Sequence, residues 1–208
     1  MDYYKLVIND RIKRKLPIVK TMSGISIAGF DCVGDIKLIE EAGRLLVRSM
    51  TQGIFDKCDY IITTELKGIP IAQEIARYIE VPYICLRKEP KVYMGNCVEL
   101  RGGNSITSGE TTYYISKDKL NKLKGKNIIF VDDVYSTGGT LNFIDKFCAE
   151  YNIKLLEAFF ILIETNDKIK RINPEVLQFY HCENNLPKYK CTAVERLPLP
   201  NSENKGEL

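Results

Sequence analysis

The apolar residues of this chain fall into two alternating patterns along the sequence. Residues 35–54 and 68–79 carry them three or four positions apart, which is the spacing of one face of an α-helix. A third helix is predicted over residues 137–151. Asp35 stands at the start of the first segment, where its carboxylate would cap the helix N-terminus.

Short apolar runs lie between the predicted helices. They cover residues 60–64, 83–86, 127–131 and 155–163, and the last two are almost continuously apolar. Strands that are buried on both faces of a parallel sheet have this composition, because helices then cover the two faces. We therefore predict an α/β fold with a parallel sheet flanked by helices.

Two regions break the alternation. Residues 88–113 are rich in glycine and polar residues, with no stable periodicity until residues 111–115. A segment of this length between core strands is usually functional, as a lid or a hairpin over a site. The end of the chain, from Pro198, is polar and is expected to fray.

The overall composition narrows the class of protein. The chain has 208 residues, a net charge of +3 and 45% hydrophobic residues, as an ordinary soluble domain has. We expect a cytoplasmic protein, because no run approaches the roughly 20 apolar residues of a membrane helix and no secretory signal is visible. The seven cysteines are odd in number and scattered, so neither a disulfide framework nor a zinc site built on His181, Cys182 and Cys191 is expected.

One segment carries a specific chemical arrangement. A buried strand is followed by two aspartates and then by Val134, Tyr135, Ser136, Thr137, Gly138, Gly139 and Thr140, at the start of the third helix. Glycines let the backbone curl so that several N–H groups point into one concavity, and the helix N-terminus adds partial positive charge. Together with the hydroxyl groups, this arrangement predicts a cradle for a phosphate monoester.

Two carboxylates directly precede the predicted cradle. Asp132 and Asp133 can accept hydrogen bonds from vicinal hydroxyl groups or help to hold a divalent cation. A phosphate cradle beside two hydroxyl acceptors describes a ribose 5-phosphate site. The order of the whole run argues against a turn that only caps the helix, and the chain contains no Walker sequence G-x-x-x-x-G-K-[ST].

Residues 131–140 resemble the signature of the type I phosphoribosyltransferases, which bind 5-phosphoribosyl 1-pyrophosphate (PRPP). Residues 61–70 resemble the family's pyrophosphate-holding junction, and Leu86-Arg87-Lys88 followed by Lys91 resembles the basic start of its mobile loop. The pattern is most similar to the purine subgroup, in particular the archaeal-type hypoxanthine and adenine enzymes. From about residue 172 the resemblance is much weaker.

The resemblance implies an organisation for the whole chain. Residues 1–208 would form one phosphoribosyltransferase domain with a Rossmann-like parallel sheet. A small hood would comprise about residues 1–35, a mobile loop about residues 88–113, and a flexible tail about residues 198–208. A homodimer is implied in the same way.

The reaction implied is transfer of the phosphoribosyl group from PRPP to a purine base, adenine or hypoxanthine/guanine, in purine salvage. The products would be the nucleoside monophosphate and pyrophosphate, with Mg²⁺ as cofactor. Asp132 and Asp133 are the expected catalytic residues. They are also the expected Mg²⁺ ligands, directly or through water, and with residues 136–140 they would bind PRPP. The residues expected to bind pyrophosphate are Glu65, Leu66, Lys67, Gly68, Arg87, Lys88 and Lys91. A non-proline cis peptide is expected at or near Leu66-Lys67.

Recognition of the base is less clearly encoded. Val134 and Tyr135 would present an apolar surface to it, and Phe30 would either stack on it or pack in the core. Ser136 stands where many hypoxanthine-guanine enzymes have an aspartate that contacts the base, so the obvious general base is missing. The archaeal-type hypoxanthine enzymes resemble this chain in having serine there.

Two alternatives stay open. One is a phosphoribosyltransferase for xanthine or a pyrimidine. The other is a PRPP-sensing regulator, which would be expected to carry an additional DNA-binding domain, whereas only about 35 residues precede the first predicted helix. The basic residues between Arg11 and Lys20 are interpreted as a solvated helix face or a subunit contact, so neither a membrane nor a nucleic acid is expected as a partner.

Overall fold

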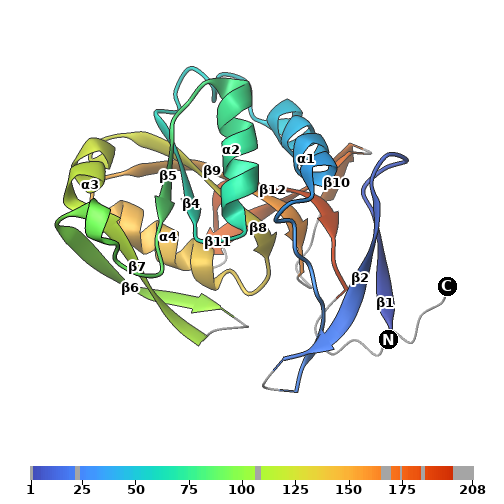
Figure 1. Ribbon diagram of the computed structural model, residues 1–208. Helices are drawn as coiled ribbons and strands as arrows, with labels where there is room; N and C mark the ends of the chain where they lie inside the picture. Colours follow the sequence, from blue (N-terminus) through green and yellow to red (C-terminus); the bar gives the residue numbers. More distant parts are fainter. Residues whose placement is uncertain are drawn as a thin grey trace.

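The computed structural model describes residues 2–21, 24–105, 109–164, 170–173, 175–183 and 186–198. At its centre lies a seven-stranded sheet in the order β10-β11-β12-β9-β8-β4-β5 (Figure 1). Its strands are β4 (Tyr60–Thr64), β5 (Tyr83–Leu86), β8 (Asn127–Tyr135), β9 (Lys154–Ile163), β10 (Lys170–Asn173), β11 (Val176–Glu183) and β12 (Leu186–Arg196).

The predicted α/β fold with a mostly parallel sheet is confirmed. Strands β12, β9, β8, β4 and β5 pair in parallel, whereas β10, β11 and β12 pair antiparallel. The sequence pattern did not predict this C-terminal extension of the sheet. It also ended β8 too early: the strand continues through Asp132 and Asp133 to Tyr135, because β9 pairs with it as far as Ile163.

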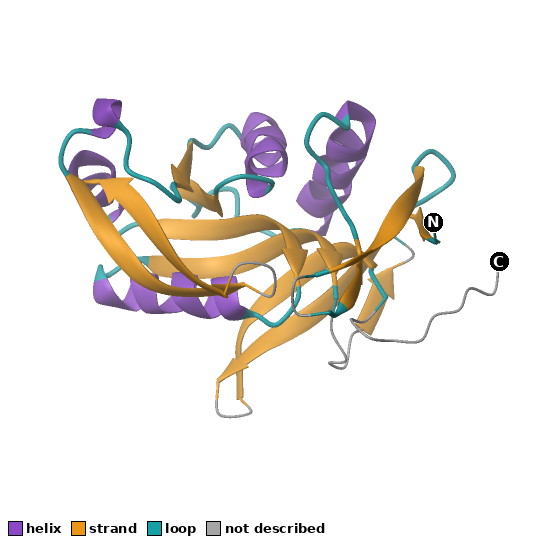
Figure 2. Ribbon diagram, turned by 60° about the horizontal axis from the view of Figure 1, so that its bottom comes forward, coloured by secondary structure: helices purple, strands orange, loops and turns teal. Residues whose placement is uncertain are grey.

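Helices cover both faces of the sheet (Figure 2). The helices α1 (Ile36–Ser49) and α2 (Gly68–Ile79) lie on one face, and α4 (Gly139–Glu150) lies on the other. Successive residues of a strand point to opposite faces, so each strand supplies two cores. Ile129 packs with the α1–α2 side, whereas its neighbours Ile128 and Phe130 pack with the α4 side.

The segment predicted as a lid or hairpin forms a two-stranded antiparallel sheet. It consists of β6 (Cys97–Ser105) and β7 (Gly109–Ser116), preceded by the short helix η1 (Val92–Met94) and followed by α3 (Lys117–Leu123). Leu100, Tyr113 and Ile115 are buried in the core on the α4 side. The base of the hairpin therefore packs on the main sheet.

The N-terminal segment forms a separate three-stranded antiparallel sheet. Its strands are β1 (Tyr3–Val7), β2 (Lys13–Lys20) and β3 (Ser26–Ala28). Lys13 and Lys15 are exposed while Leu16 is buried, so the basic run lies on a solvated strand and not on a helix. The interpretation of this run as a helix face was wrong, because its alternating apolar residues pack one face of the ribbon on the core that contains α1.

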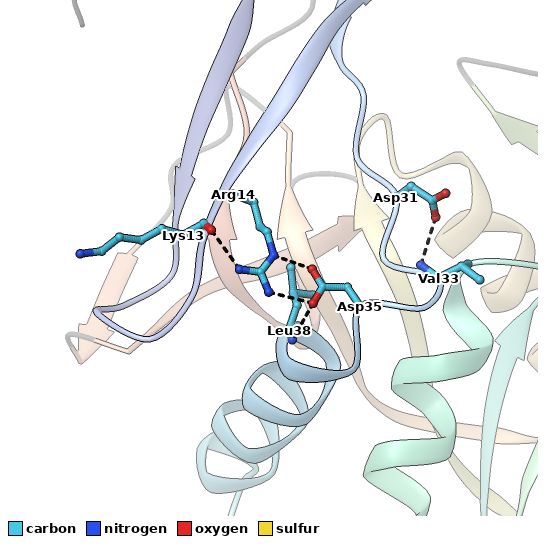
Figure 3. A network of polar contacts seen from close by, with 6 residues as sticks. All are labelled: Lys13, Arg14, Asp31, Val33, Asp35 and Leu38. Atoms are coloured by element: carbon cyan, nitrogen blue, oxygen red, sulfur yellow. Dashed lines mark hydrogen bonds and ion pairs between the residues drawn. The ribbon is translucent and has the colours of Figure 1, made fainter.

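A polar network fastens this N-terminal sheet to α1 (Figure 3). The Arg14 guanidinium donates hydrogen bonds of 2.6 and 2.8 Å to the two carboxylate oxygens of Asp35. Asp35 also accepts from the Leu38 backbone N–H at 3.2 Å, which makes it the predicted N-cap of α1. The Asp35 carboxylate therefore links the N-terminus of α1 to strand β2.

The remaining expectations concern the chain end and membranes. Apart from Pro198, the predicted tail over residues 198–208 lies outside the described residues. Within the described ranges, no helix is long and apolar enough to cross a membrane.

Candidate functional site

A cavity of about 380 Å³ lies at the carboxyl ends of the central parallel strands. Three stretches of chain make most of its wall: residues 27–30 at the end of β3, residues 64–67 at the end of β4, and residues 132–141 from the end of β8 into α4. The wall is completed by Lys88, Tyr113, Phe160, Glu164 and Leu197. Segments far apart in the sequence therefore meet at the edge of the sheet where ligands bind in α/β proteins.

The β8–α4 loop (residues 136–138) curls at the N-terminus of α4. Gly138 adopts φ +76°, a left-handed conformation that glycine accepts without steric cost, and occupies the N-cap position of the helix. A Cβ atom at this position would lie 2.9 Å from the Tyr135 hydroxyl oxygen. Residues 136–140 line the cavity, so the N-terminus of α4 borders it, as an anion site requires.

Tyr135 supports this loop from below. Its ring centroid lies 5.3 Å from that of Phe160 and 4.8 Å from that of Phe179, in the core on the α4 side. The side chain is buried and its hydroxyl group points toward Gly138. The ring therefore forms the floor under the loop, while Val134 is the more exposed of the two residues expected to face a base.

The two aspartates at the end of β8 occupy different environments. Asp132 accepts a hydrogen bond from the Thr64 hydroxyl group at 3.3 Å and from the Asp133 backbone N–H at 3.0 Å. Asp133 forms an ion pair with Lys67, with 2.6 Å between Nζ and Oδ2. Burial, and then the charge of Asp133, raise the pKa of Asp132 well above its ordinary value.

Lys67 joins three parts of the cavity wall. Besides its ion pair with Asp133, its ammonium group donates to the Phe30 carbonyl oxygen at 3.1 Å. Burial opposes the charged form, but the Asp133 carboxylate outweighs it and raises the pKa of Lys67. Beneath it, the buried Cys32 thiol donates to the Lys67 carbonyl oxygen at 3.3 Å.

The β4–α2 loop (residues 65–67) packs tightly against β8. The expected cis peptide is present between Glu65 and Leu66, one bond before the position named. Gly68 is the first residue after the loop. A Cβ atom on it would lie 2.3 Å from Thr63 Oγ1 and 2.7 Å from Asp132 Oδ1. Only glycine lets the first turn of α2 approach the aspartates this closely.

The structure brings most of the predicted site residues together, but not all of them. The cavity is lined by Phe30, Glu65, Leu66, Lys67, Lys88, Asp132, Asp133, Val134, Tyr135 and residues 136–140. Gly68, Arg87 and Lys91 are outside its wall. Arg87 pairs with Glu65 at 3.1 Å and Lys91 with Glu89 at 2.8 Å, so both cations are held by neighbouring carboxylates.

Further wall residues that were not predicted are Thr64, Tyr113, Leu141, Phe160, Glu164 and Leu197. Glu164 accepts a hydrogen bond from the Ser136 hydroxyl group at 2.9 Å, and burial raises its pKa above the ordinary value. A signal for Glu164 was present, because it is the first charged residue after an apolar strand adjacent to β8. Tyr113 comes from the hairpin, and no local pattern assigns it to this site.

The capacity of the site for a metal ion depends on its two aspartates. Among the residues that the structure describes, no group of three or more His, Cys, Asp or Glu side chains could hold a metal by itself. Mg²⁺ is commonly bound through one or two carboxylates together with water and phosphate oxygens of the substrate. The adjacent carboxylates of Asp132 and Asp133 fit this kind of partial coordination.

Known proteins share both sequence and fold with the chain. The family model described as phosphoribosyl transferase domain matches residues 33–183. The purine biosynthesis transcriptional repressor PurR of Bacillus subtilis is 25% identical over 147 residues, which are 71% of this chain and 50% of that protein. The hypoxanthine/guanine phosphoribosyltransferase of Methanotorris igneus is 33% identical over 106 residues, which are 50% of this chain and 52% of that one. The chain thus spans about half the length of these relatives.

Two solved structures of adenine phosphoribosyltransferases have a similar fold. The enzyme from Thermoanaerobacter pseudethanolicus superposes with a TM-score of 0.63 at 18% identity, covering 87% of this chain and 95% of that one. The enzyme from Rhodothermus marinus gives a TM-score of 0.58 at 17% identity, covering 88% and 94%. At these identities the likeness concerns the fold.

Proposed function

Since the chain belongs to the phosphoribosyl transferase domain family, we propose that it transfers the 5-phosphoribosyl group of PRPP to a purine base and releases pyrophosphate. One observation carries the proposal: the β8–α4 loop and the Asp132–Asp133 pair share a single cavity with Lys67. This order of phosphate cradle, hydroxyl acceptors and cation matches the order of chemical groups along PRPP.

The 5-phosphate would bind at the β8–α4 loop. The backbone N–H groups of residues 137–139 and the N-terminus of α4 can donate hydrogen bonds to its oxygens. The hydroxyl groups of Thr137 and Thr140 can donate as well, and both residues line the cavity. Gly138 leaves the concavity open for the phosphate.

The ribose hydroxyl groups would bind to Asp132 and Asp133. Carboxylates accept hydrogen bonds from vicinal hydroxyl groups, and their negative charge stabilises the cationic ribosyl centre that develops as pyrophosphate leaves. Mg²⁺, when bound, would neutralise part of the pyrophosphate charge. Thr64, which donates to Asp132, would orient that carboxylate.

The pyrophosphate group would bind along the β4–α2 loop. Lys67 and Lys88 both line the cavity and supply positive charge, and the N-terminus of α2 lies directly after the loop. Lys67 is paired with Asp133, so the incoming pyrophosphate would share or replace that partner. Arg87 and Lys91 could contribute after exchanging Glu65 and Glu89 for phosphate oxygens.

The purine would bind between β8 and the N-terminal sheet. Val134 and residues 27–30 both line the cavity. Phe30 is buried in the core that contains α1, and its carbonyl oxygen already accepts from Lys67, which favours a supporting role for this residue. We extend the proposal to one domain over the chain, a cytoplasmic homodimer, and a role in purine salvage.

The test is release of pyrophosphate from PRPP and Mg²⁺ with adenine, hypoxanthine, guanine, xanthine and orotate offered separately. Turnover with a purine is expected, and the Asp132→Asn/Asp133→Asn double variant should lose it while remaining folded. Asp10→Asn is the matched control, because Asp10 is fully exposed. Full activity of the double variant would overturn the site assignment.

A PRPP-binding regulator is the second candidate, favoured by the similarity to the Bacillus subtilis repressor. It predicts that PRPP binds, by calorimetry, while none of the five bases supports turnover. Turnover with orotate alone would instead identify a pyrimidine enzyme. Both outcomes would overturn purine transfer.

A further inference from the structure

Glu164 is a buried carboxylate at the edge of the cavity. It follows the last residue of β9, and only 8% of its surface is exposed. Its backbone N–H donates to the Tyr135 carbonyl oxygen at 2.7 Å, which fixes the residue beside the end of β8. Its position is therefore set by the sheet and not by a loose loop.

The side chain of Glu164 is only partly satisfied. The Ser136 hydroxyl group donates to Oε2 at 2.9 Å. The other oxygen, Oε1, is buried and accepts no hydrogen bond from any residue that the structure describes. A buried carboxylate oxygen without a donor is costly, so a ligand that supplies an N–H group would gain from this position.

The charged groups of the cavity wall favour different parts of a ligand. Lys67, Lys88 and the N-terminus of α4 favour anionic groups, whereas a carboxylate repels them. Glu164 is accordingly unsuited to contact a phosphate. It shares the cavity with Val134, Leu197 and residues 27–30, whose mainly apolar surface suits a flat heterocycle.

The hydrogen bonds already made by the cavity wall determine whether it offers donors or acceptors to a base. Because the Ser136 hydroxyl proton is directed to Glu164, the oxygen of Ser136 is left as an acceptor toward the cavity. The backbone N–H groups of Gly29 and Leu197 are already engaged with the carbonyl oxygens of Pro17 and Ile163. This corner of the cavity thus offers acceptors to a ligand.

We infer that Glu164 is a specificity-determining residue that accepts a hydrogen bond from an exocyclic amino group of the base, so that adenine is preferred over hypoxanthine. This inference rests on the proposed function and names the substrate within it. A 6-oxo group in the same place would set an oxygen against the Glu164 carboxylate and the Ser136 oxygen. The amino group would instead donate to the unsatisfied Oε1.

The test compares kcat/KM for adenine and hypoxanthine in the wild type and in Glu164→Gln. Glutamine keeps the size of the side chain and an oxygen for Ser136, but it replaces one acceptor by an NH₂ donor. The adenine-to-hypoxanthine ratio should fall by about tenfold or more, since a hydrogen bond to a charged group is lost. Glu40→Gln, on the exposed surface of α1, is the matched control and should leave the ratio unchanged.

Binding of AMP and IMP by calorimetry gives a readout that does not need turnover, and it should show the same change of preference. A wild type that prefers hypoxanthine, or an unchanged ratio in Glu164→Gln, would overturn the inference and leave the proposed function standing. Absence of both turnover and nucleotide binding in the wild type would overturn the two together.

A variation of the ligand covers the case in which Glu164→Gln does not fold. Unsubstituted purine lacks the amino group, so wild-type kcat/KM for it should fall by about tenfold or more relative to adenine. Equal use of purine and adenine would contradict the assigned contact.

Discussion

Asp132 is a carboxylate that the fold places in an unfavourable environment for its charged form. It is buried beside Asp133, and Lys67 pairs with Asp133 at 2.6 Å. Burial and the neighbouring charge raise the pKa of Asp132 well above its ordinary value of 3.8. The folded protein therefore binds this proton more tightly than the unfolded chain does, and the stabilisation it brings is lost as the pH rises.

Asp132→Asn should accordingly stabilise the protein while abolishing turnover. The variant cannot ionise, so its advantage over the wild type should be small near pH 3.8 and grow as the pH rises through the raised pKa of Asp132. An increase of about 2–4 °C in Tm corresponds to roughly 1 kcal/mol for a chain of this size.

Thermal unfolding of both proteins from pH 4 to pH 8 measures this difference, with Asp10→Asn as the exposed control. A Tm advantage that shrinks with rising pH would contradict the raised pKa of Asp132. Active sites often contain buried charges that are needed for function and lower the stability of the fold.

At the scale of elements, an ion pair joins the N-terminal sheet to the start of α1. Asp35 accepts hydrogen bonds from Arg14 of β2 and from the Leu38 backbone N–H (Figure 3). The Arg14 hydrogen bond lowers the pKa of Asp35, so its contribution is present above the unfolded value and is lost as acid protonates it.

Asp35→Ala should lower the free energy of unfolding at pH 7 by about 1–2 kcal/mol, since it removes a helix cap and leaves Arg14 without its carboxylate. Asp35→Asn should lose less, because asparagine still caps a helix. Urea unfolding at pH 7 and below pH 3 measures both effects. A deficit of equal size at the two pH values would show that the ion pair contributes nothing.

The elements predicted best are those whose signals are local. The bounds of β4, α2 and β5 agree with the sequence pattern because glycine and proline residues mark their ends, as Gly68 and Pro82 do. The C-terminal strands are not marked by local signals of this kind. β12 gains its stability from parallel pairing with β9, some 30 residues earlier, and a local pattern does not reveal that partner.

The candidate site divides in the same way. The residues from Asp132 to Thr140 are contiguous, so one motif places all of them at the end of β8. Glu164 and Tyr113 reach the cavity from other elements and became evident in the folded chain. Arg87 and Lys91 were assigned from their charge, and their carboxylate partners could be identified only from the structure.

For the whole molecule, the cavity joins parts that otherwise belong to different sheets and cores. Its wall combines residues 27–30, at the end of β3 in the N-terminal sheet, with the ends of β4 and β8. A ligand bound there would connect these parts in the folded state and have no equivalent site in the unfolded chain.

PRPP with Mg²⁺ at about 100 times its Kd should therefore stabilise the protein by about 2.7 kcal/mol. For a chain of this size, that is roughly 5–10 °C in Tm. Gly138→Val should remove the shift, because a side chain at φ +76° would be strained and its Cβ would lie 2.9 Å from the Tyr135 hydroxyl oxygen. Thermal unfolding with and without PRPP measures the shift. A full shift in Gly138→Val would place PRPP elsewhere.

Because the Cys32 thiol lies beneath Lys67, its chemical reactivity can report on opening of the site at the β4–α2 loop. The thiol is fully buried, and burial followed by the charge of Asp133 raises its pKa to about 12, so little reactive thiolate exists at neutral pH. An alkylating reagent can reach the sulfur only when the residues that cover it, the β4–α2 loop among them, move apart. The rate of covalent labelling at Cys32 therefore reports how often this part of the site opens. Neither a ligand affinity nor a melting temperature gives this rate.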